Sequence, residues 1–205
     1  MSENAKAVAA RSSDGTHFMT VALEHASRLI NHGPTVLVTS GHGTARNVMA
    51  AAWSMPVEFT PPRIAVVIDK RTYTRELIMA SGAFGMCLPG AALAGLTYAV
   101  GGVSGRTKDK FTQHNLREDR GPVLGVPLLQ EGCAAWLECR LIREPHTEDA
   151  YDTCFAEVVA AAADDRIFRH GHWCFDSGNA DLQTIHHLGG GNFVRSAGML
   201  SAGSS

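Results

Sequence analysis

The sequence predicts a mainly β protein whose strands form a closed or partly open antiparallel barrel with a few peripheral helices. Short β-rich runs outnumber helical segments, their spacing is too irregular for repeated βαβ units, and no fixed repeat is visible. With 205 residues, of which 45% are hydrophobic and 19% charged, the chain can bury one sizeable core. We therefore expect one domain over residues 17–198, between a disordered N-terminal tail (residues 1–16) and a flexible C-terminal tail (residues 199–205).

The first half of this domain begins with a helix and continues with strands. Apolar residues at i, i+3, i+4 and i+7 from Phe18 onward predict a helix that ends at Gly33-Pro34. Short apolar runs, bounded by glycine, proline and polar turns, predict strands over residues 35–39, 63–68 and 83–88. Residues 47–54 could form a strand or a helix, and their length and neighbours favour a strand. Before the last of these strands, Thr74 is a candidate cap for a short helix that ends at Gly82.

The second half is predicted to be a strand meander. Residues 91–100 have a helical composition that ends at Gly101-Gly102, and the charged residues 106–120 look mobile. Strands are then predicted over residues 134–140, 155–160 and 166–175, followed by a glycine- and serine-rich tail after Gly189.

Charge and hydropathy exclude several classes of partner. The net charge of −2 argues against a whole-protein attraction to nucleic acid or to an anionic membrane. Residues 77–105 carry no charge, but Gly82, Pro89-Gly90 and Gly101-Gly102 interrupt them, so no span of about 20 apolar residues exists. The N-terminus has no apolar leader, and five cysteines without a C-x-x-C pair indicate free thiols. We expect a cytoplasmic protein that binds neither nucleic acid nor membrane.

Several familiar motifs are absent. The sequence has no G-x-G-x-x-G and no G-x-S-x-G, and in the stretch 101–107 Val100 and Arg106 stand where a phosphate-binding loop requires Gly and Lys. His170, His172 and Cys174 alternate as on one strand face, but three ligands in so short a stretch seldom make a tetrahedral set. We predict no metal site, and a metal- or haem-handling barrel stays as an alternative from another class.

One signal is spread along the chain. Its five parts are T-S and A-A-W-S around residues 47–54, P-P before a strand, K-R-T-Y-T at 70–74, S-G-R-T-K-D-K-F at 104–111, and H-H-L-G-G-G-N-F at 186–193. In this combination the chain resembles the flavin reductase-like, FMN-binding split-barrel family, which includes the flavoredoxins. The resemblance covers roughly residues 25–195 and implies an antiparallel split β-barrel with peripheral α-helices, an FMN cofactor and a homodimer.

The residue types in these segments suit FMN. Its phosphate needs cations and donors, which Lys70, Arg71, Thr72 and Thr74 offer at the start of a helix, where free N–H groups also attract anions. Its flat ring system needs a close apolar wall, which the alanine-rich backbone before Trp53 offers, and Trp53 itself can stack on the ring.

The resemblance also assigns site residues. The positions that match the family's flavin contacts are Asn47, Trp53, Thr74 and Lys110, with Phe193 as the aromatic residue from the tail. The candidate catalytic residues are Lys110, whose cation would stabilise the negative charge of reduced flavin near N1 and O2, and His187. The full set of candidate cofactor-binding residues is Ser40, Asn47, Val48, Met49, Ala51, Ala52, Trp53, Ser54, Lys70, Arg71, Thr72, Thr74, Ser104, Gly105, Lys110 and Phe193.

The sequence departs from the family pattern at one position. Many relatives carry Gly-Asp-His before a strand, whereas this chain has Asp152-Thr153-Cys154 and no histidine there. His146 and His187 are candidates for the missing role, and spacing does not choose between them.

The resemblance implies an oxidoreductase. NADH or NADPH would deliver a hydride to flavin N5, and the electrons would pass to free flavin, a metal chelate or a redox partner protein. The alternative is a non-enzymatic, flavoredoxin-like electron carrier that binds FMN without a nicotinamide site, which the missing histidine keeps open.

Overall fold

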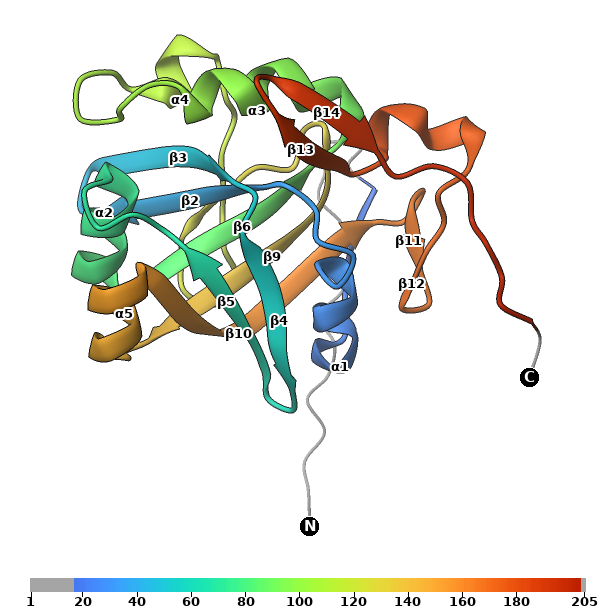
Figure 1. Cartoon of the computed structure of the whole chain (residues 1–205), viewed down its shortest axis with the longest axis horizontal. Helices are drawn as coiled ribbons and strands as arrows, with labels where there is room; N and C mark the ends of the chain where they lie inside the picture. Colours follow the sequence, from blue (N-terminus) through green and yellow to red (C-terminus); the bar gives the residue numbers. More distant parts are fainter. Residues whose placement is uncertain (1–16, 204–205) are drawn as a thin grey trace.

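The computed structural model describes residues 17–203, which build one curled antiparallel sheet with helices around it (Figure 1). The main sheet has eight strands in the order β3-β2-β6-β9-β10-β5-β4, with β1 paired to β10. Its strands are β1 (Phe18–Thr20), β2 (Val36–His42), β3 (Ala45–Ala51), β4 (Ser54–Phe59), β5 (Pro62–Val67), β6 (Ala83–Pro89), β9 (Cys133–Ile142) and β10 (Thr153–Asp164). Three small two-stranded sheets join β7 (Asp119–Arg120) to β8 (Pro127–Leu128), β11 (Phe168–Arg169) to β12 (His172–Trp173), and β13 (Ile185–Gly189) to β14 (Asn192–Arg195).

The long strand β10 explains why the sheet curls without closing. Its first half pairs with β5, its last residues pair with β1, and a bulge between Val158 and Ala160 bends it where it pairs with β9. The two ends of the sheet, β3 and β4, do not pair with each other. The predicted fold class, an antiparallel split barrel with peripheral helices, is therefore confirmed.

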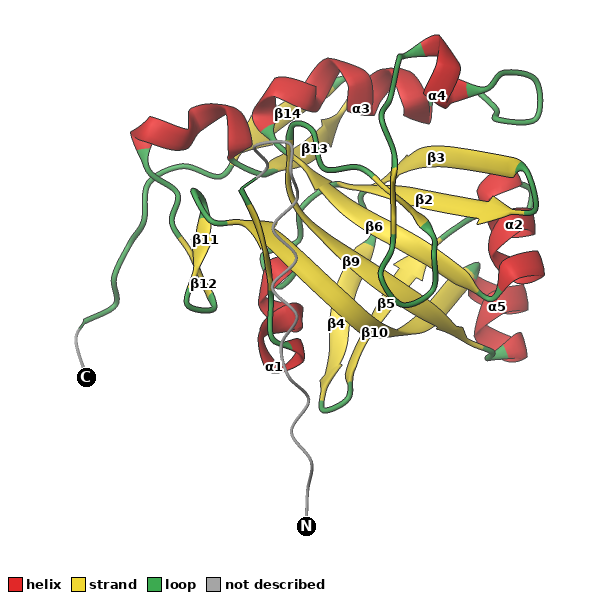
Figure 2. Ribbon diagram, turned by 180° about the vertical axis from the view of Figure 1, so that it is seen from behind, coloured by secondary structure: helices red, strands yellow, loops and turns green. Residues whose placement is uncertain are grey.

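Helices lie at the rim of the barrel, and Figure 2 shows most of them above and beside the sheet. They are α1 (Leu23–Ala26), α2 (Tyr73–Ser81), α3 (Ala94–Gly101), α4 (Lys110–Gln113) and α5 (Pro145–Tyr151), with short 3-10 helices η1 (Ser27–Leu29), η2 (Ala91–Leu93) and η3 (Ser177–Leu182). Among residues 17–203, no helix has the length and apolar character needed to cross a bilayer.

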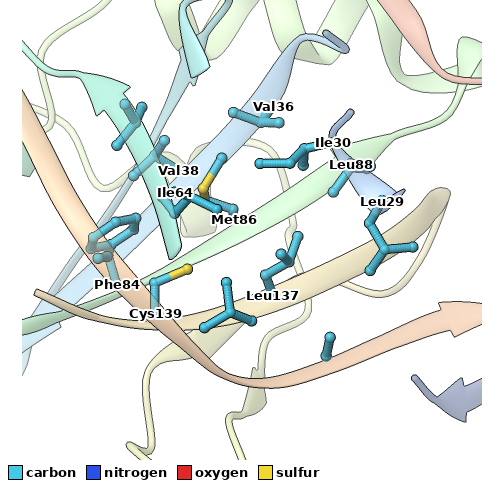
Figure 3. Packing of buried hydrophobic residues seen from close by; sticks show 14 of the residues in the cluster. Leu29, Ile30, Val36, Val38, Ile64, Phe84, Met86, Leu88, Leu137 and Cys139 are labelled. Atoms are coloured by element: carbon cyan, nitrogen blue, oxygen red, sulfur yellow. The ribbon is translucent and has the colours of Figure 1, made fainter. Parts of the chain in front are cut away.

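The core fills the inside of the curled sheet (Figure 3). Strand β6 is buried along its whole length, as the uninterrupted apolar run of its sequence predicts. The buried cluster includes Leu29, Ile30, Val36, Val38, Ile64, Phe84, Met86, Leu88, Leu137 and Cys139. Leu29 and Ile30 are fully buried in this cluster, so the segment after β1 packs into the core.

The helix predicted to start at Phe18 is wrong at its beginning. Residues 18–20 form strand β1, whose register pairs Phe18 with Asp164, and the helical turns begin only at Leu23. The helical spacing of the apolar residues is real, but the last residues of β10 offer backbone partners that local sequence does not reveal.

Residues 106–120 are more regular than predicted. Within residues 106–120, Asp109 caps α4 by accepting from the amides of Phe111 and Thr112, and Phe111 is buried. Arg46 binds Asp109 (3.3 Å) and Glu118 (3.1 Å), which fixes this segment on β3. The stretch is therefore packed rather than a free loop.

The strand predicted over residues 166–175 is instead the hairpin of β11 and β12. It turns at His170 and Gly171, which both have positive φ, as a tight hairpin turn requires. His170, His172 and Cys174 therefore do not share one strand face. The tail after Gly189 likewise contains a strand, β14, whereas the predicted tail of residues 1–16 lies outside the described residues.

Two histidines tie the β13–β14 hairpin to the barrel. His32 Nε2 lies 2.8 Å from Thr184 Oγ1, and the Ser196 hydroxyl lies 3.0 Å from both Thr184 Oγ1 and His186 Nε2. His186 Nδ1 lies 3.0 Å from the Gly33 carbonyl. Burial, and secondarily the nearby His186, lowers the pKa of His32 to about 4.

This low pKa predicts a loss of stability in mild acid. The unfolded chain takes up a proton on His32 near pH 6.5 but the folded chain only near pH 4, so the stabilisation is complete above pH 6.5 and is lost as the pH falls. Denaturant unfolding should therefore show that His32 removes about 2 kcal/mol of stability between pH 8 and pH 5. In His32→Phe this part of the pH dependence should disappear, and the exposed control His17→Asn should retain it. An unchanged pH dependence in His32→Phe would contradict the assignment.

Candidate functional site

A cleft of about 430 Å³ lies along the free edge of β3, between α2, α3 and the start of α4. Figure 1 shows α3 and α4 above β3 and α2 at one end of it. Side chains and backbone from four separate segments line the cleft: Asn47, Met49, Ala50, Asp69, Arg71, Thr72, Tyr73, Thr74, Val100, Gly101, Gly102, Val103, Ser104, Gly105 and Lys110. Its size is that of a small-molecule site.

The N-terminus of α2 forms one end of this cleft. Thr72 caps the helix: its hydroxyl accepts from the Arg75 amide (3.2 Å) and donates to the Asp69 carbonyl (2.8 Å). The cap is thus Thr72 and not the predicted Thr74, which is buried within the first turn. The amides of a helix's first turn have no partners within the helix, and together with the helix dipole they favour an anion.

A buried arginine that the sequence did not single out holds this helix in place. The guanidinium of Arg75 donates to the carbonyls of Ile68 (3.2 Å) and Glu148 (3.2 Å) and to Cys154 Sγ (2.9 Å). It thereby joins the first turn of α2 to β10 and α5, so the helix N-terminus keeps a fixed direction toward the cleft.

Asn47 joins two of the predicted binding segments. Its Nδ2 donates to Thr74 Oγ1 over 2.8 Å, and both residues are buried. Its Oδ1 is also buried and finds no hydrogen-bond partner within the described part of the chain. An unsatisfied buried acceptor is costly, so its place beside the cleft points to a functional role of Asn47.

Gly105 lies directly on the Asn47 amide. A Cβ atom at position 105 would stand 2.1 Å from Asn47 Oδ1 and 2.6 Å from Asn47 Cγ, which is far inside van der Waals contact. Only glycine therefore lets the 104–105 backbone cover Asn47 at the mouth of the cleft.

Lys110 lies at the inner side of the cleft and is 3% exposed. Its Nζ donates to the carbonyls of Val48 (2.8 Å) and Val100 (2.7 Å), so it ties β3 to the end of α3. Burial without an acidic partner lowers the pKa of Lys110 to about 8. An ammonium has three N–H donors, which leaves one for a ligand in the cleft.

The backbone of β3 presents further groups to the cleft. Since the Val48 carbonyl accepts from Lys110, the backbone groups of residue 48 point away from β2. The strand alternates, so the N–H and C=O of Ala50, which lines the cleft, point the same way. A flat ligand along β3 would meet a donor, an acceptor and a small side chain at that position.

The cations predicted at this site carry counter-ions. Arg71 forms a bidentate pair with Asp69, with Nη2 2.6 Å from Oδ2 and Nε 3.1 Å from Oδ1. Lys70 lies outside the lining of the cleft, and its Nζ is 3.9 Å from Asp152 Oδ1.

The structure brings part of the predicted set together. Eight predicted residues line the cleft: Asn47, Met49, Arg71, Thr72, Thr74, Ser104, Gly105 and Lys110. The others lie outside its lining: Ser40, Val48, Ala51, Ala52, Trp53, Ser54, Lys70, Phe193 and His187. Trp53 is 75% exposed at the corner between β3 and β4, and His187 contacts Phe193 on the β13–β14 hairpin (ring centroids 5.2 Å apart).

Sequence reasoning missed several lining residues. Ala50 lies between two predicted residues but was not itself predicted as a site residue. Asp69 directly precedes the K-R-T-Y-T segment, and Tyr73 stands between its two threonines. The four lining residues from Val100 to Val103 follow from α3 ending beside β3, where Gly101 faces the Ala50 side chain.

Other features of the described residues do not add to the candidate site. A cleft of about 560 Å³ between α3 and residues 114–117, and another of about 540 Å³ near the β2–β3 turn, are lined by none of the predicted site residues. Within residues 17–203, no three His, Cys, Asp or Glu side chains converge as a metal site. Burial raises the pKa of the Cys87 thiol to about 12, so it is unreactive at neutral pH.

Comparison with known proteins identifies the fold family. The sequence profile of the flavin reductase like domain matches residues 28–175, which include every residue that lines the β3 cleft. The chain belongs to the flavin reductase-like family. The resemblance seen in the five sequence segments is therefore confirmed.

Similar proteins include one sequence relative and two solved structures. The uncharacterized protein YddH of Escherichia coli K12 is 54% identical over 190 residues, which are 92% of this chain and 100% of the relative. An FMN-binding domain of a flavin reductases-like enzyme from Shewanella baltica OS155 has a TM-score of 0.88 at 40% identity, covering 92% and 98% of the two chains. Flavoredoxin of Desulfovibrio vulgaris (Miyazaki F) has a TM-score of 0.69 at 26% identity, covering 82% and 89%.

Proposed function

We propose that the chain binds FMN in the β3 cleft and acts as an NAD(P)H-dependent oxidoreductase of the flavin reductase-like type. The observation that carries this proposal is the combination of a buried lysine, Lys110, on one side of the cleft with a capped helix N-terminus at its end. The first would meet the ring system, which becomes anionic on reduction, and the second the phosphate. Bound FMN would supply the redox chemistry, accepting a hydride at N5 and passing electrons to free flavin, a metal chelate or a protein partner.

Different residues of the cleft would bind different parts of FMN. The first-turn amides of α2, with Thr72, Thr74 and Arg71 around them, suit the phosphate. Met49, Ala50 and the small residues after α3 form the wall against which a flat ring can lie, and the Asn47 amide joins β3 to Thr74 at the phosphate end. Lys110 keeps a positive charge in a place from which water is largely excluded, where its electrostatic effect is strong.

The decisive experiment is the visible spectrum of the purified protein. We expect the absorption of oxidised flavin, as purified or after added FMN and gel filtration, and its bleaching under anaerobic conditions by NADH or NADPH. A protein that takes up no FMN would contradict the proposal. Release of the chromophore and its chromatography against FMN, FAD and riboflavin would identify the flavin.

One observation supports an electron carrier as the second candidate. The Gly-Asp-His of many relatives is absent, and none of the described residues that line the cleft is a histidine. A carrier would bind FMN, remain oxidised with both nicotinamide nucleotides, and be bleached by a reduced partner protein. Rapid mixing with NADH and NADPH separates the two functions.

Exposed apolar side chains along β4 support a homodimer. Trp53, just before this edge strand, and Met55, Val57 and Phe59 within it are all exposed, which is unusual for a monomer. A second copy of the chain would cover them, and Trp53 lies just after the strand that borders the cleft. We expect sizing at micromolar concentration to give a dimer, Met55→Lys to give a monomer, and the exposed control Leu188→Lys on β13 to stay dimeric. A monomeric wild-type protein would contradict this proposal.

A further inference from the structure

Three cations in or next to the lining of the cleft are each paired with an acid. Arg71 binds Asp69, Lys70 lies near Asp152, and Arg106 binds Glu76 and also stacks on the Tyr73 ring (5.3 Å from the centroid). An anion that arrives at the α2 N-terminus therefore finds these positive charges already compensated.

Asp69 is the only one of these three acids that itself lines the cleft within the described chain. Its carboxylate accepts from the Arg71 guanidinium through Nε and Nη2, and also from the Arg71 backbone amide (2.8 Å). These are the donors that a phosphate at the start of α2 would use. The hydrogen bonds and charge of Arg71 hold the pKa of Asp69 at about 2, so it is an anion at neutral pH.

The position of Asp69 is fixed by the helix cap. Its carbonyl accepts from the Thr72 amide (2.9 Å) and from the Thr72 hydroxyl (2.8 Å), so residue 69 forms one turn with the cap of α2. The turn thus holds the backbone of residue 69 at the phosphate end, and the bonds to the amide and guanidinium of Arg71 keep the carboxylate there. A phosphate would have to share Arg71 with it and would lie near a like charge.

We infer that Asp69 competes with the cofactor phosphate for Arg71 and makes FMN an exchangeable ligand of this chain instead of a permanently held group. The inference rests on the proposed function and deepens it, because it assigns to one residue the choice between flavin as substrate and flavin as prosthetic group. It also predicts that Asp69 lowers the ratio of FMN affinity to riboflavin affinity. Without this carboxylate, Arg71 and the helix N-terminus would favour the phosphate-bearing flavin more strongly.

The test compares two flavins on matched variants. FMN and riboflavin are titrated by fluorescence quenching into the wild type, Asp69→Asn, and Glu157→Gln, a partly exposed acid paired with Arg140 on the neighbouring strand of the sheet. The side-chain oxygen of the amide in Asp69→Asn can still accept from the Arg71 backbone N–H, so the turn is retained. We expect Asp69→Asn to bind FMN about tenfold more tightly, a difference that shrinks with added salt, while riboflavin binding changes less than about twofold. Glu157→Gln should match the wild type.

The outcomes separate this inference from the proposed function. If the wild type binds FMN but Asp69→Asn leaves the ratio of FMN to riboflavin affinity unchanged, the inference is overturned and the function stands. Equal weakening of both flavins in Asp69→Asn would make Asp69 a purely structural residue and would also overturn it. Binding of neither flavin to the wild type would remove the proposed function, and the inference with it.

Discussion

Replacing Lys110 by Gln is expected to slow the reduction of bound FMN by NAD(P)H by about ten- to a hundredfold. Lys110 is buried and has no acidic partner in the described chain, so its charge is not screened by a counter-ion. A charge in such a place contributes roughly 1–3 kcal/mol to an anion forming beside it. For a two-electron couple this corresponds to a midpoint potential about 20–60 mV more negative in the variant. Spectroelectrochemical titration and stopped-flow reduction measure the two quantities.

The design separates charge from packing. Glutamine can still donate to the carbonyls of Val48 and Val100, so Lys110→Gln keeps part of the tie between β3 and α3 that a methionine would lose. Lys108→Met, a substitution of an exposed lysine in the same loop, is the control and should reduce at the wild-type rate. Unchanged potential and rate in Lys110→Gln, with FMN still bound, would remove the electrostatic role.

The same lysine predicts a pH dependence that a structural role would not produce. Its pKa is lowered to about 8 in the cleft, so the charge is present below pH 8 and is lost above it. An anionic reduced flavin beside it would raise that pKa. The wild-type rate of reduction should therefore fall at or above about pH 8, toward the rate of Lys110→Gln, and the variant should lack this step.

The sequence predicts the central strands of the sheet better than the first strand, β1. The runs over residues 35–39 and 63–68 are rich in β-branched residues, the run over residues 83–88 is wholly apolar, and each corresponds to a strand of the main sheet. Strand β1 was missed because its partner on β10 lies more than 140 residues away in the sequence, as the pair Phe18 and Asp164 shows. Local periodicity carries no information on such a partner.

The candidate site was likewise predictable only in part from the sequence. Asn47, Thr74 and Lys110 come from three distant segments and meet in one cleft, which the order of the family segments predicted. Side-chain direction was not predictable in the same way: the chain bends between Ala51 and Ser54, and this bend turns Trp53 to the surface. Asp69 was missed because the basic pair after it was read for its positive charge, whereas the structure shows that the acid and Arg71 act together.

Gly105→Ala is expected to weaken FMN binding by about ten- to a hundredfold with little change in global stability. The added methyl would collide with Asn47 Oδ1 and Cγ, so either the 104–105 backbone or the Asn47 amide must move, and both line the cleft. Overpacking of this kind costs roughly 1–3 kcal/mol, which the protein can avoid by displacing the loop away from the site. The matched control is Gly95→Ala, since a Cβ at Gly95 meets nothing within 4 Å and alanine favours the helix α3. Fluorescence titration with FMN and thermal unfolding of both variants check this. Wild-type FMN affinity in Gly105→Ala would show that the contact between Gly105 and Asn47 is not needed to shape the binding site.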